Sequence, residues 1–431
     1  MTARKRAAFV CAIATVASML AGQPAQAEAG IDYYLTPDIP AGTAPAGATE
    51  VQKVPNLKAG DTLYLSGTYK RNILVMDKEG VPGNPIRIIG DNATIDSTGN
   101  GLILMDTSYI EVGGIHATGR ATNTGIMVWH DDAPGMRDIR IDNVSVEGFR
   151  NGLFAGTDST TPTIDGLSIT NSTFSKAVNN NVLTHSPIGS RGLRNVTIDN
   201  VTVHSAGGDP TLKDRNSGSG IVLGGVTDGV IRNSLAYNNG LNSSASEGPE
   251  GIWAYSSDNL TIENNVSRDN KTSGTDGNGF GFDIDVHNSV MRGNVSRNNY
   301  GAGYLVYTYG DWHTNGNIVE NNRSENDNAR STHSWSPIVI AGDAGKPGKG
   351  YVSNTIVRNN TIFQRPGEKR CAVYVQGRVR NVKLDGNKRT GGTCELTNKA
   401  DNPGEVAQGG DVKPFPTPIP WGSLGSGSLG F

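Results

Sequence analysis

The sequence predicts an all-β protein that winds into a parallel β-helix of about ten rungs. The first observation is a motif of one apolar residue, any residue and Asn, which recurs along most of the chain. The apolar residues of the motif lie at positions 141, 169, 198, 231, 262, 291, 319, 357 and 384, and Val112 holds the equivalent place in an earlier repeat. Gly replaces the Asn of the motif after Met291 and Leu384. The steps between these apolar residues stay within 27 to 38 residues. This regular interval is typical of a solenoid, in which each repeat contacts its neighbours.

The second observation is that the repeat consists of β-strands. Apolar and polar residues alternate around each motif, as in Ile139-Arg-Ile141-Asp, with the period of a strand. A second strand follows each first one, and the predicted first residues are Ile126, Leu153, Val182, Ile221, Ile252, Phe280, Tyr304, Ile338 and Val373. At a strand spacing of about 4.8 Å, stacked Asn side chains could donate to one neighbour and accept from the other. We therefore expect an asparagine ladder inside one turn, formed by Asn143, Asn171, Asn200 and Asn233.

Composition agrees with a single long domain. The chain has 57 Gly residues, 18% charged residues and 35% hydrophobic residues, which suits many turns around one narrow core. We assign residues 57–400 to the β-helix and 28–56 to an N-terminal segment that caps it. Residues 401–431 form a Pro- and Gly-rich tail, which we expect to be irregular.

The first 27 residues predict a signal peptide. Arg4, Lys5 and Arg6 precede an apolar stretch over residues 7–20, and Ala25-Gln-Ala27 is a cleavage site of the A-x-A kind. Their removal takes the formal net charge from −3 to −6 and leaves no basic stripe for nucleic acid. No later segment is apolar and long enough to span a membrane. We expect a secreted, monomeric protein.

The two cysteines of the mature chain have matching places in their repeats. Cys371 lies two residues before Val373, and Cys394 lies two residues before Leu396, where the next second strand should begin. Neighbouring rungs stack at a distance that disulfide geometry tolerates. We predict a disulfide between these rungs, which fits an oxidising compartment.

Residues 57–90, LKAGDTLYLSGTYKRNILVMDKEGVPGNPIRIIG, resemble the opening of secreted right-handed parallel β-helix proteins of the pectate-lyase-like superfamily. The resemblance continues to about residue 400 and implies a right-handed coil. Residues 274–304 resemble a stretch common in family nine polysaccharide lyases, although Gly281 follows GNGF where those lyases carry a catalytic Lys shortly after it. The same segment resembles the YGFD-P-H motif of alginate C5-epimerases, with Asp283 matching the Asp, Phe280 replacing the Tyr and Asp285 replacing the His. These resemblances imply an enzyme that acts on acidic glycans.

Rung lengths predict where a site lies. From first-strand anchor to second-strand start, the spacing is 12 to 14 residues in the rungs at 112, 141, 169 and 291, but 18 to 23 in those at 198, 231, 262 and 319. Because these insertions occupy the same turn of nearly adjacent rungs, they should stack into a wall beside the second-strand sheet. Long loops on a rigid scaffold often carry function.

The outer face beside this wall predicts a sugar platform. Alternation along the second strands sends Trp253 and Tyr255 outward on one rung, Asp283 on the next and Tyr307 on the third. Aromatic rings can stack on the C–H faces of pyranose rings while carboxylates take the hydroxyl groups. Further substrate-binding candidates in the loops after these strands are Tyr309, Trp312, His313 and Trp335.

Three hypotheses follow. In the first, which we favour on resemblance, an acidic glycan is cleaved by elimination or epimerised, with Lys213 or Tyr307 as base and Ca²⁺ held by Asp276, Asp283 and Asp285. In the second, Asp283 and Asp285 are the acid and base of an inverting glycoside hydrolase, because two same-face strand residues lie about 6.6 Å apart. In the third, the face binds glycan without reaction. The acidic chain offers no general attraction to an anionic polymer, so the first hypothesis depends on calcium or on local Lys and Arg residues.

Overall fold

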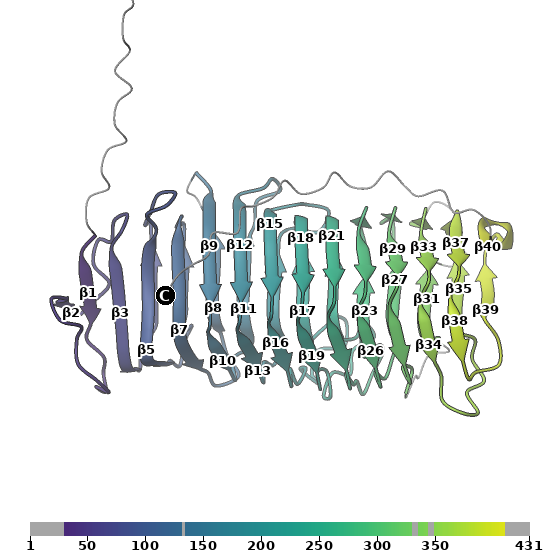
Figure 1. Ribbon diagram of the computed structural model, residues 1–431, viewed down its shortest axis with the longest axis horizontal. Coiled ribbons are helices and arrows are strands. Elements are labelled where there is room, and N and C mark those ends of the chain that lie inside the picture. The colour runs from purple at the N-terminus through teal and green to yellow at the C-terminus, as the bar shows by residue number, and fades with distance from the viewer. Residues whose placement is uncertain (1–29, 132–133, 330–334, 344–348, 410–431) are drawn as a thin grey trace, which may run out of the picture.

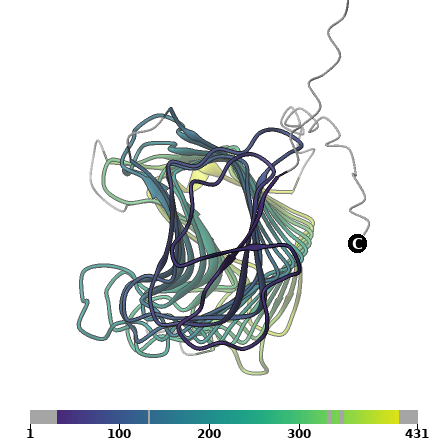
Figure 2. The same cartoon turned by 90° about the vertical axis from the view of Figure 1, so that its left-hand side faces the viewer.

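The chain coils into a long solenoid whose rungs stack along one axis (Figure 1). A computed structural model describes residues 30–131, 134–329, 335–343 and 349–409. Strands pair in parallel in one sheet of 28 strands and one of 12 strands. Viewed along the axis, successive rungs superimpose around a common interior (Figure 2). The helical content of the described residues is one 3₁₀ turn, η1 (Pro403–Glu405).

The large sheet covers two faces of the solenoid. Its first face holds β1 (Asp32–Leu35), β3 (Thr62–Tyr69), β5 (Ile86–Asp96), β7 (Ile110–Thr118), β9 (Met136–Asp142), β12 (Ile164–Thr170), β15 (Leu193–Asp199), β18 (Val226–Arg232), β21 (Ser257–Glu263), β24 (Val286–His287), β25 (Val290–Arg292), β28 (Thr314–Asn315), β29 (Ile318–Glu320), β32 (Val352–Ser353), β33 (Ile356–Arg358), β36 (Val379–Arg380), β37 (Val382–Asp385) and β40 (Val406–Gln408). Its second face holds β10 (Ser145–Glu147), β13 (Thr173–Ser175), β16 (Thr202–His204), β19 (Leu235–Tyr237), β22 (Val266–Arg268), β26 (Val295–Arg297), β30 (Arg323–Glu325), β34 (Thr361–Phe363) and β38 (Lys388–Thr390), while β2 (Thr49–Val51) pairs with β1.

The twelve-stranded sheet forms the remaining face and carries the site described below. Its members are β4 (Ile73–Met76), β6 (Leu102–Met105), β8 (Thr124–His130), β11 (Asn151–Thr157), β14 (Asn180–His185), β17 (Ser219–Gly224), β20 (Glu250–Tyr255), β23 (Asn278–Phe282), β27 (Tyr304–Tyr307), β31 (Ile338–Ala341), β35 (Val373–Gly377) and β39 (Leu396–Ala400).

The predicted repeat is confirmed in register. Motif residues pair directly across the large sheet, Val112 with Ile141 and so on to Val357 with Leu384. The predicted first residues of the second strands also pair with one another, from Ile126 to Val373. Both sets point inward and are buried, so stacked apolar columns form the core. The parallel pairing reaches beyond residues 57–400, because β1 pairs with β3 and β40 pairs with β37.

The predicted asparagine ladder is wrong in its position. Asn143, Asn171, Asn200 and Asn233 have φ angles of 51°, 50°, 55° and 54°, and all four are exposed. They serve a tight turn that needs the left-handed conformation, which Gly and Asn tolerate best. This requirement explains Gly293 and Gly386, with φ of 65° and 59°, at the equivalent places after Met291 and Leu384.

The buried ladder begins one residue later in the repeat. Amide groups are linked through Asn265, Asn294, Asn322, Asn360 and Asn387, at N···O distances of 2.9 to 3.1 Å. A second ladder runs through Asn181, Asn239, Asn270 and Asn299 and ends on the carboxylate of Asp327. Each side chain therefore satisfies its buried polar groups by bonding to the adjacent rungs.

The predicted disulfide is confirmed. Cys371 and Cys394 are bonded, with their Cα atoms 4.5 Å apart. They flank the pairing of β35 with β39, where Val373 lies opposite Leu396 as expected. The proposed signal peptide, residues 1–27, and most of the predicted tail lie outside the described residues. Within the described ranges, no helix is long and apolar enough to cross a membrane.

Candidate functional site

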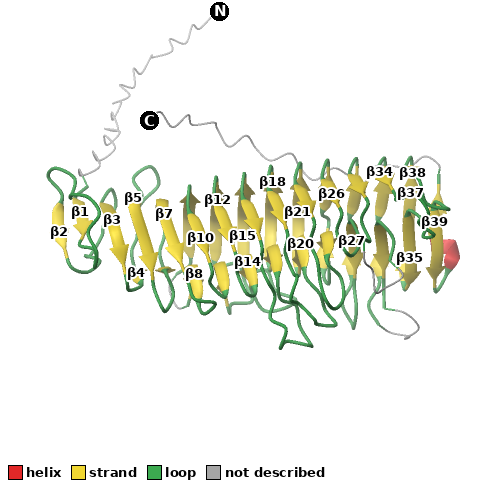
Figure 3. Ribbon diagram, turned by 90° about the horizontal axis from the view of Figure 1, so that it is seen from below, coloured by secondary structure: helices red, strands yellow, loops and turns green. Residues whose placement is uncertain are grey.

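A groove of about 700 Å³ lies on the outer face of the twelve-stranded sheet, over strands β14 to β27. One wall consists of the loops that precede β17, β20 and β23, which contribute Arg215, Glu247 and Asp276 among others. These loops protrude near the middle of the solenoid (Figure 3). The opposite wall includes Ile188, Ile284 and segments that follow β27 and β31. The long insertions therefore border a groove, as their stacking predicts.

The outward column predicted from strand alternation lines the floor. Trp253, Tyr255, Asp283 and Tyr307 all contact the groove, whereas Ile252 and Phe280 are fully buried in the core. The Nε1 group of Trp253 donates to Ser219 Oγ at 3.1 Å, and the rings of Trp253 and Tyr255 lie 5.6 Å apart. This part of the predicted platform is therefore assembled.

A second aromatic group closes the other end of the groove. Tyr307 lies 6.0 Å from Tyr309 and 6.3 Å from Trp335 between ring centroids, and all three rings line the groove. Burial and the nearby carboxylates of Glu247 and Asp283 raise the pKa of Tyr309 to about 12. Burial also raises the pKa of Tyr307, so its hydroxyl stays protonated and can donate a hydrogen bond.

Asp283 lies at the centre of the groove, one position beyond the end of β23. Its Oδ1 atom accepts a hydrogen bond from the Ile284 N–H at 2.8 Å, and within the described chain its Oδ2 atom has no hydrogen-bond partner. Burial raises the pKa of Asp283 to about 7, with a further contribution from the negative charges of Asp276 and Glu247. At neutral pH this carboxyl group is therefore balanced between its acid and base forms.

Glu250 supplies a second carboxyl group to the floor. It begins strand β20, and its side chain extends over the next rung, because a Cβ built on Gly281 would lie 2.1 Å from Glu250 Oε2. Gly281 thus leaves room for this carboxyl group. Gly281 and Asp283 lie on the same face, with Cα atoms roughly 6.6 Å apart in strand geometry. Glu250 and Asp283 therefore present their carboxyl groups to the same groove.

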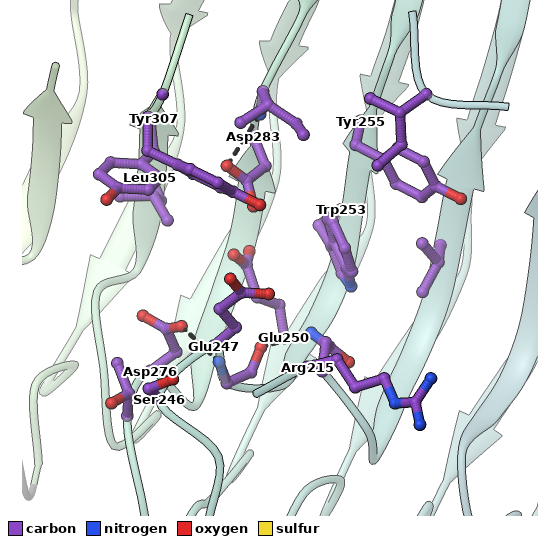
Figure 4. A pocket seen from close by; sticks show the side chains of 18 of the residues that line it. Arg215, Ser246, Glu247, Glu250, Trp253, Tyr255, Asp276, Asp283, Leu305 and Tyr307 are labelled. Carbon is purple, nitrogen blue, oxygen red and sulfur yellow. Dashed lines mark hydrogen bonds between the residues drawn. The ribbon is translucent and has the colours of Figure 1, made fainter. Parts of the chain in front are cut away.

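The surroundings of Glu250 favour its protonated form. Its side chain is 3% exposed, and within the described residues its Oε2 atom has no hydrogen-bond partner. Burial raises the pKa of Glu250 well above its usual range, assisted by the charges of Asp276 and Asp283 and opposed by the Asn278 amide. Burial likewise raises the pKa of Glu247. Figure 4 shows these carboxyl groups around the groove together with Trp253 and Tyr307.

Asp285 is not part of this site, so its predicted place beside Asp283 is wrong. Strand β23 ends at Phe282, and Asp285 has a φ of 59°, which breaks the alternation used to predict its direction. Its carboxylate bonds to Arg191 and His287, each at 2.9 Å. Burial acts to raise the pKa of Asp285, but these two partners outweigh it and hold the pKa below its usual range.

Three other candidates also lie away from the groove lining. Lys213 is exposed and donates to Ser244 Oγ in the neighbouring loop. Trp312 packs near Gly189, and the His313 ring lies 4.0 Å from Tyr351. In the part of the chain that the structure describes, the basic residues that line the groove are Arg215 and Lys349, and Lys349 bonds to Asp311 at 2.8 Å.

The predicted calcium ligands do not converge. Asp283 and Asp276 both line the groove, but Asp285 is bound to Arg191 and His287 outside it. Among the described residues, no group of three or more His, Cys, Asp or Glu side chains could hold a metal ion. Asp276 instead accepts a hydrogen bond from the Gly248 N–H at 2.9 Å, which ties two wall loops together.

Comparison with known proteins agrees with this architecture. A family model described as a right handed beta helix region matches residues 124–336. The fold is a right-handed parallel β-helix. No curated protein matches the sequence significantly.

Several solved structures share the fold at low sequence identity. The A-module of a mannuronan C-5 epimerase from Azotobacter vinelandii has a TM-score of 0.57 at 14% identity, covering 81% of this chain and 91% of that one. The GH136 lacto-N-biosidase of Eubacterium ramulus has a TM-score of 0.52 at 12% identity, covering 84% and 68%. The catalytic unit of a GH87 alpha-1,3-glucanase from Streptomyces thermodiastaticus has a TM-score of 0.51 at 12% identity, covering 82% and 63%.

Proposed function

We propose that this protein hydrolyses a neutral glycan in the groove, with Glu250 as general acid and Asp283 as general base. The observation that carries the proposal is the pair of carboxyl groups, both with raised pKa values, on a floor lined by aromatic rings. The spacing of roughly 6.6 Å between the Cα atoms of Gly281, over which Glu250 lies, and Asp283 is compatible with the carboxyl gap that inverting glycoside hydrolases use to admit a water molecule. Glu250 thus takes the place that Asp285 has in the hydrolase hypothesis.

The reaction follows from the two protonation states. Protonated Glu250 gives its proton to the glycosidic oxygen as the bond from that oxygen to the anomeric carbon breaks. Ionised Asp283 takes a proton from a water molecule, whose oxygen forms the new bond to the anomeric carbon from the opposite side. The products are a shortened glycan and a new reducing end of inverted configuration. One further proton exchange with solvent restores both carboxyl groups.

The groove favours a neutral substrate over an acidic one. Among the described residues, its lining includes Glu247, Glu250, Asp276, Asp283 and Asp343 against two basic residues, one of them paired with Asp311. A uronate carboxylate would meet like charge there, and the three aspartates predicted to hold calcium do not lie together. We therefore place hydrolysis ahead of the elimination or epimerisation that the sequence resemblance favours.

Aromatic residues account for the choice of a glycan. Trp253 and Tyr255 at one end of the floor, and Tyr307, Tyr309 and Trp335 at the other, offer ring faces on either side of the carboxyl pair. Two of the similar solved structures are a lacto-N-biosidase and an alpha-1,3-glucanase, which supports glycan cleavage on this kind of scaffold. The protein would act outside the cell if residues 1–27 direct export as predicted.

The test is a screen of the purified chain against neutral and acidic polysaccharides. We expect new reducing ends from a neutral glycan, without the ultraviolet absorbance of unsaturated products. Proton NMR during the first turnover should show the inverted anomer, and Glu250→Gln should abolish the signal. Unsaturated products from a uronate polymer would instead establish elimination, and binding without any product would establish a glycan-binding protein.

A further inference from the structure

A row of aromatic rings extends from the groove toward the amino-terminal end of the solenoid. The outward position that holds Tyr255 on β20 is occupied on earlier rungs by Gly224, His185, Gly156 and Trp129. Aromatic and glycine residues therefore alternate along five consecutive rungs. Positions two rungs apart are separated by about 9.6 Å, twice the strand spacing.

The glycines allow these rings to lie over the neighbouring rungs. A Cβ on Gly224 would lie 2.2 Å from the Tyr255 ring, and a Cβ on Gly156 would lie 3.3 Å from the Trp129 ring. Tyr255 also reaches across to His185, with 3.1 Å between its hydroxyl and His185 Nδ1. A larger side chain at either glycine would push these rings away from the sheet.

Phe154 completes the row from the adjacent outward position on β11. Its ring stacks on Trp129 at 5.8 Å and 16°, and on His185 at 6.0 Å and 26°. Trp129, Phe154 and His185 are each partly exposed, so part of each ring remains accessible to solvent. The result is a continuous ring surface from Trp129 to the groove.

We propose that Trp129, Phe154 and His185 bind the sugars of a neutral glycan chain beyond its point of cleavage. The kind of ligand, a neutral glycan, rests on the hydrolysis proposed above. The place where it binds rests on the continuity of the aromatic row with the groove. Five rung steps separate Trp129 on β8 from Asp283, so the bound chain would cover about 24 Å. A ligand of several linked sugar rings is needed to cover that distance.

The chemistry of this surface fits an uncharged ligand. The outward side chains of β8, β11 and β14 are Met127, Trp129, Phe154, Leu183 and His185, and they include no carboxylate, Lys or Arg. Burial lowers the pKa of His185, which favours its neutral form. Pyranose rings can place C–H groups against aromatic rings. Purely polar or ionic ligands lack such groups.

Chain-length dependence of binding tests this inference. The probes are disaccharides, tetrasaccharides and octasaccharides of cellulose, xylan and mannan, and binding is measured by calorimetry on the Asp283→Asn protein to prevent turnover. In that background, Trp129→Ala and Phe154→Ala should each weaken octasaccharide binding by about tenfold, the order expected for a lost ring contact, and leave disaccharide binding unchanged. Trp129→Phe provides a milder variant if the alanine variant fails to fold.

Tyr237→Ala is the matched control. Tyr237 stacks on His204 at 4.8 Å and 15°, but on the second face of the large sheet, so its removal should not affect any probe. If Asp283→Asn proteins with and without Trp129→Ala bind the octasaccharide equally well, the proposed binding role of the aromatic row is wrong. The hydrolysis proposal would be unaffected by that result. Length-dependent weakening in a protein whose wild type forms no product would support the platform and overturn hydrolysis. A wild type that binds none of the probes and cleaves none of them would overturn both for these glycans.

Discussion

Acidic residues on the two sides of this solenoid are held in opposite electrostatic states. On the large sheet, carboxylates face arginines of neighbouring rungs, as in Asp199 with Arg232 at 2.7 Å and Glu263 with Arg292 at 2.8 Å. On the groove side, no salt bridge joins Asp283 or Glu250 to a Lys or Arg within the described chain. Carboxylates paired with arginine therefore hold neighbouring rungs together, whereas the carboxyl groups of Asp283 and Glu250 can exchange a proton.

Asp283 and Asp285 show the same contrast two residues apart. Asp283 faces the groove and has a pKa of about 7 because burial and like charges disfavour ionisation. Asp285 is ionised, because Arg191 and His287 outweigh the effect of its burial. Arg191 also binds Asp258 at 2.8 Å, so this cluster ties separate rungs together. Sequence distance alone does not predict which aspartate is chemically available.

The largest expected effect comes from Asp283→Asn. The change keeps side-chain size but removes the general base, so turnover should fall by about a hundredfold or more. The unfolding temperature should stay the same or rise slightly, because a costly buried charge disappears. Steady-state kinetics and thermal denaturation measure the two quantities. Full activity in this variant would move the catalytic role to another groove carboxylate.

Asp327→Asn tests a carboxyl group with a raised pKa that lies away from the groove. Burial raises the pKa of Asp327 to about 6, against an unfolded value near 3.9. The native state therefore binds the extra proton, and the wild type should lose about 3 kcal/mol of unfolding free energy as the pH rises from about 4 to above 6. The asparagine variant continues the ladder and should lack this loss. Urea denaturation at several pH values provides the measurement, and an unchanged pH profile would exclude Asp327 as its source.

Asp285→Asn should lower stability and spare turnover, whereas Asp283→Asn should lower turnover and spare stability. Loss of the charge that binds Arg191 and His287 should lower the free energy of unfolding by about 2 kcal/mol, while the turnover of folded protein stays near the wild-type value. Asp311→Asn is the control, since its ion pair with Lys349 involves an aspartate side chain that is 76% exposed, and such solvent-screened pairs contribute little to stability. A large loss of turnover in Asp285→Asn would argue against our assignment of the pair.

The smallest expected effect sharpens the electrostatic comparison. The negative charge of Glu247 helps to raise the pKa of Asp283, so Glu247→Gln should lower that pKa. Because Asp283 acts in its ionised form, activity should rise as the pH increases through about 7 in the wild type and at a lower pH in the variant. The shift is read from kcat/KM against pH. A rising limb that moves to higher pH would contradict the roles assigned here.

Much of the fold follows directly from the sequence. Inward residues repeat at fixed places, so Ile126 and Val373 could be aligned through many rungs, and the same phase predicts the bond between Cys371 and Cys394. The sequence predicts the ladder one residue too early, because the pattern around Asn143 does not distinguish a buried amide from a left-handed turn. Local backbone geometry decides between them, and that geometry is not visible in an alternating pattern.

The site could be predicted only in part. Strand alternation places Trp253, Tyr255 and Tyr307 correctly, but it fails for Asp285 because the strand has already ended. Glu250 is visible in the sequence only as an acidic residue near a wall loop. Its role depends on the empty space above Gly281 on the next rung, a relation between rungs that one sequence position does not reveal. The outward Gly281 was the signal that could have pointed to it.

The link between Cys371 and Cys394 has a consequence for how this molecule comes apart. A solenoid is stabilised by contacts between neighbouring rungs, so its end rungs are the first to open. At the carboxyl end the covalent bond joins β35 to β39, and the outermost rung cannot separate from the one before it. Fraying from this end must open two rungs together, which slows the attack of proteases. Among the described residues, no disulfide joins the rungs at the amino-terminal end, so proteolytic degradation should begin there.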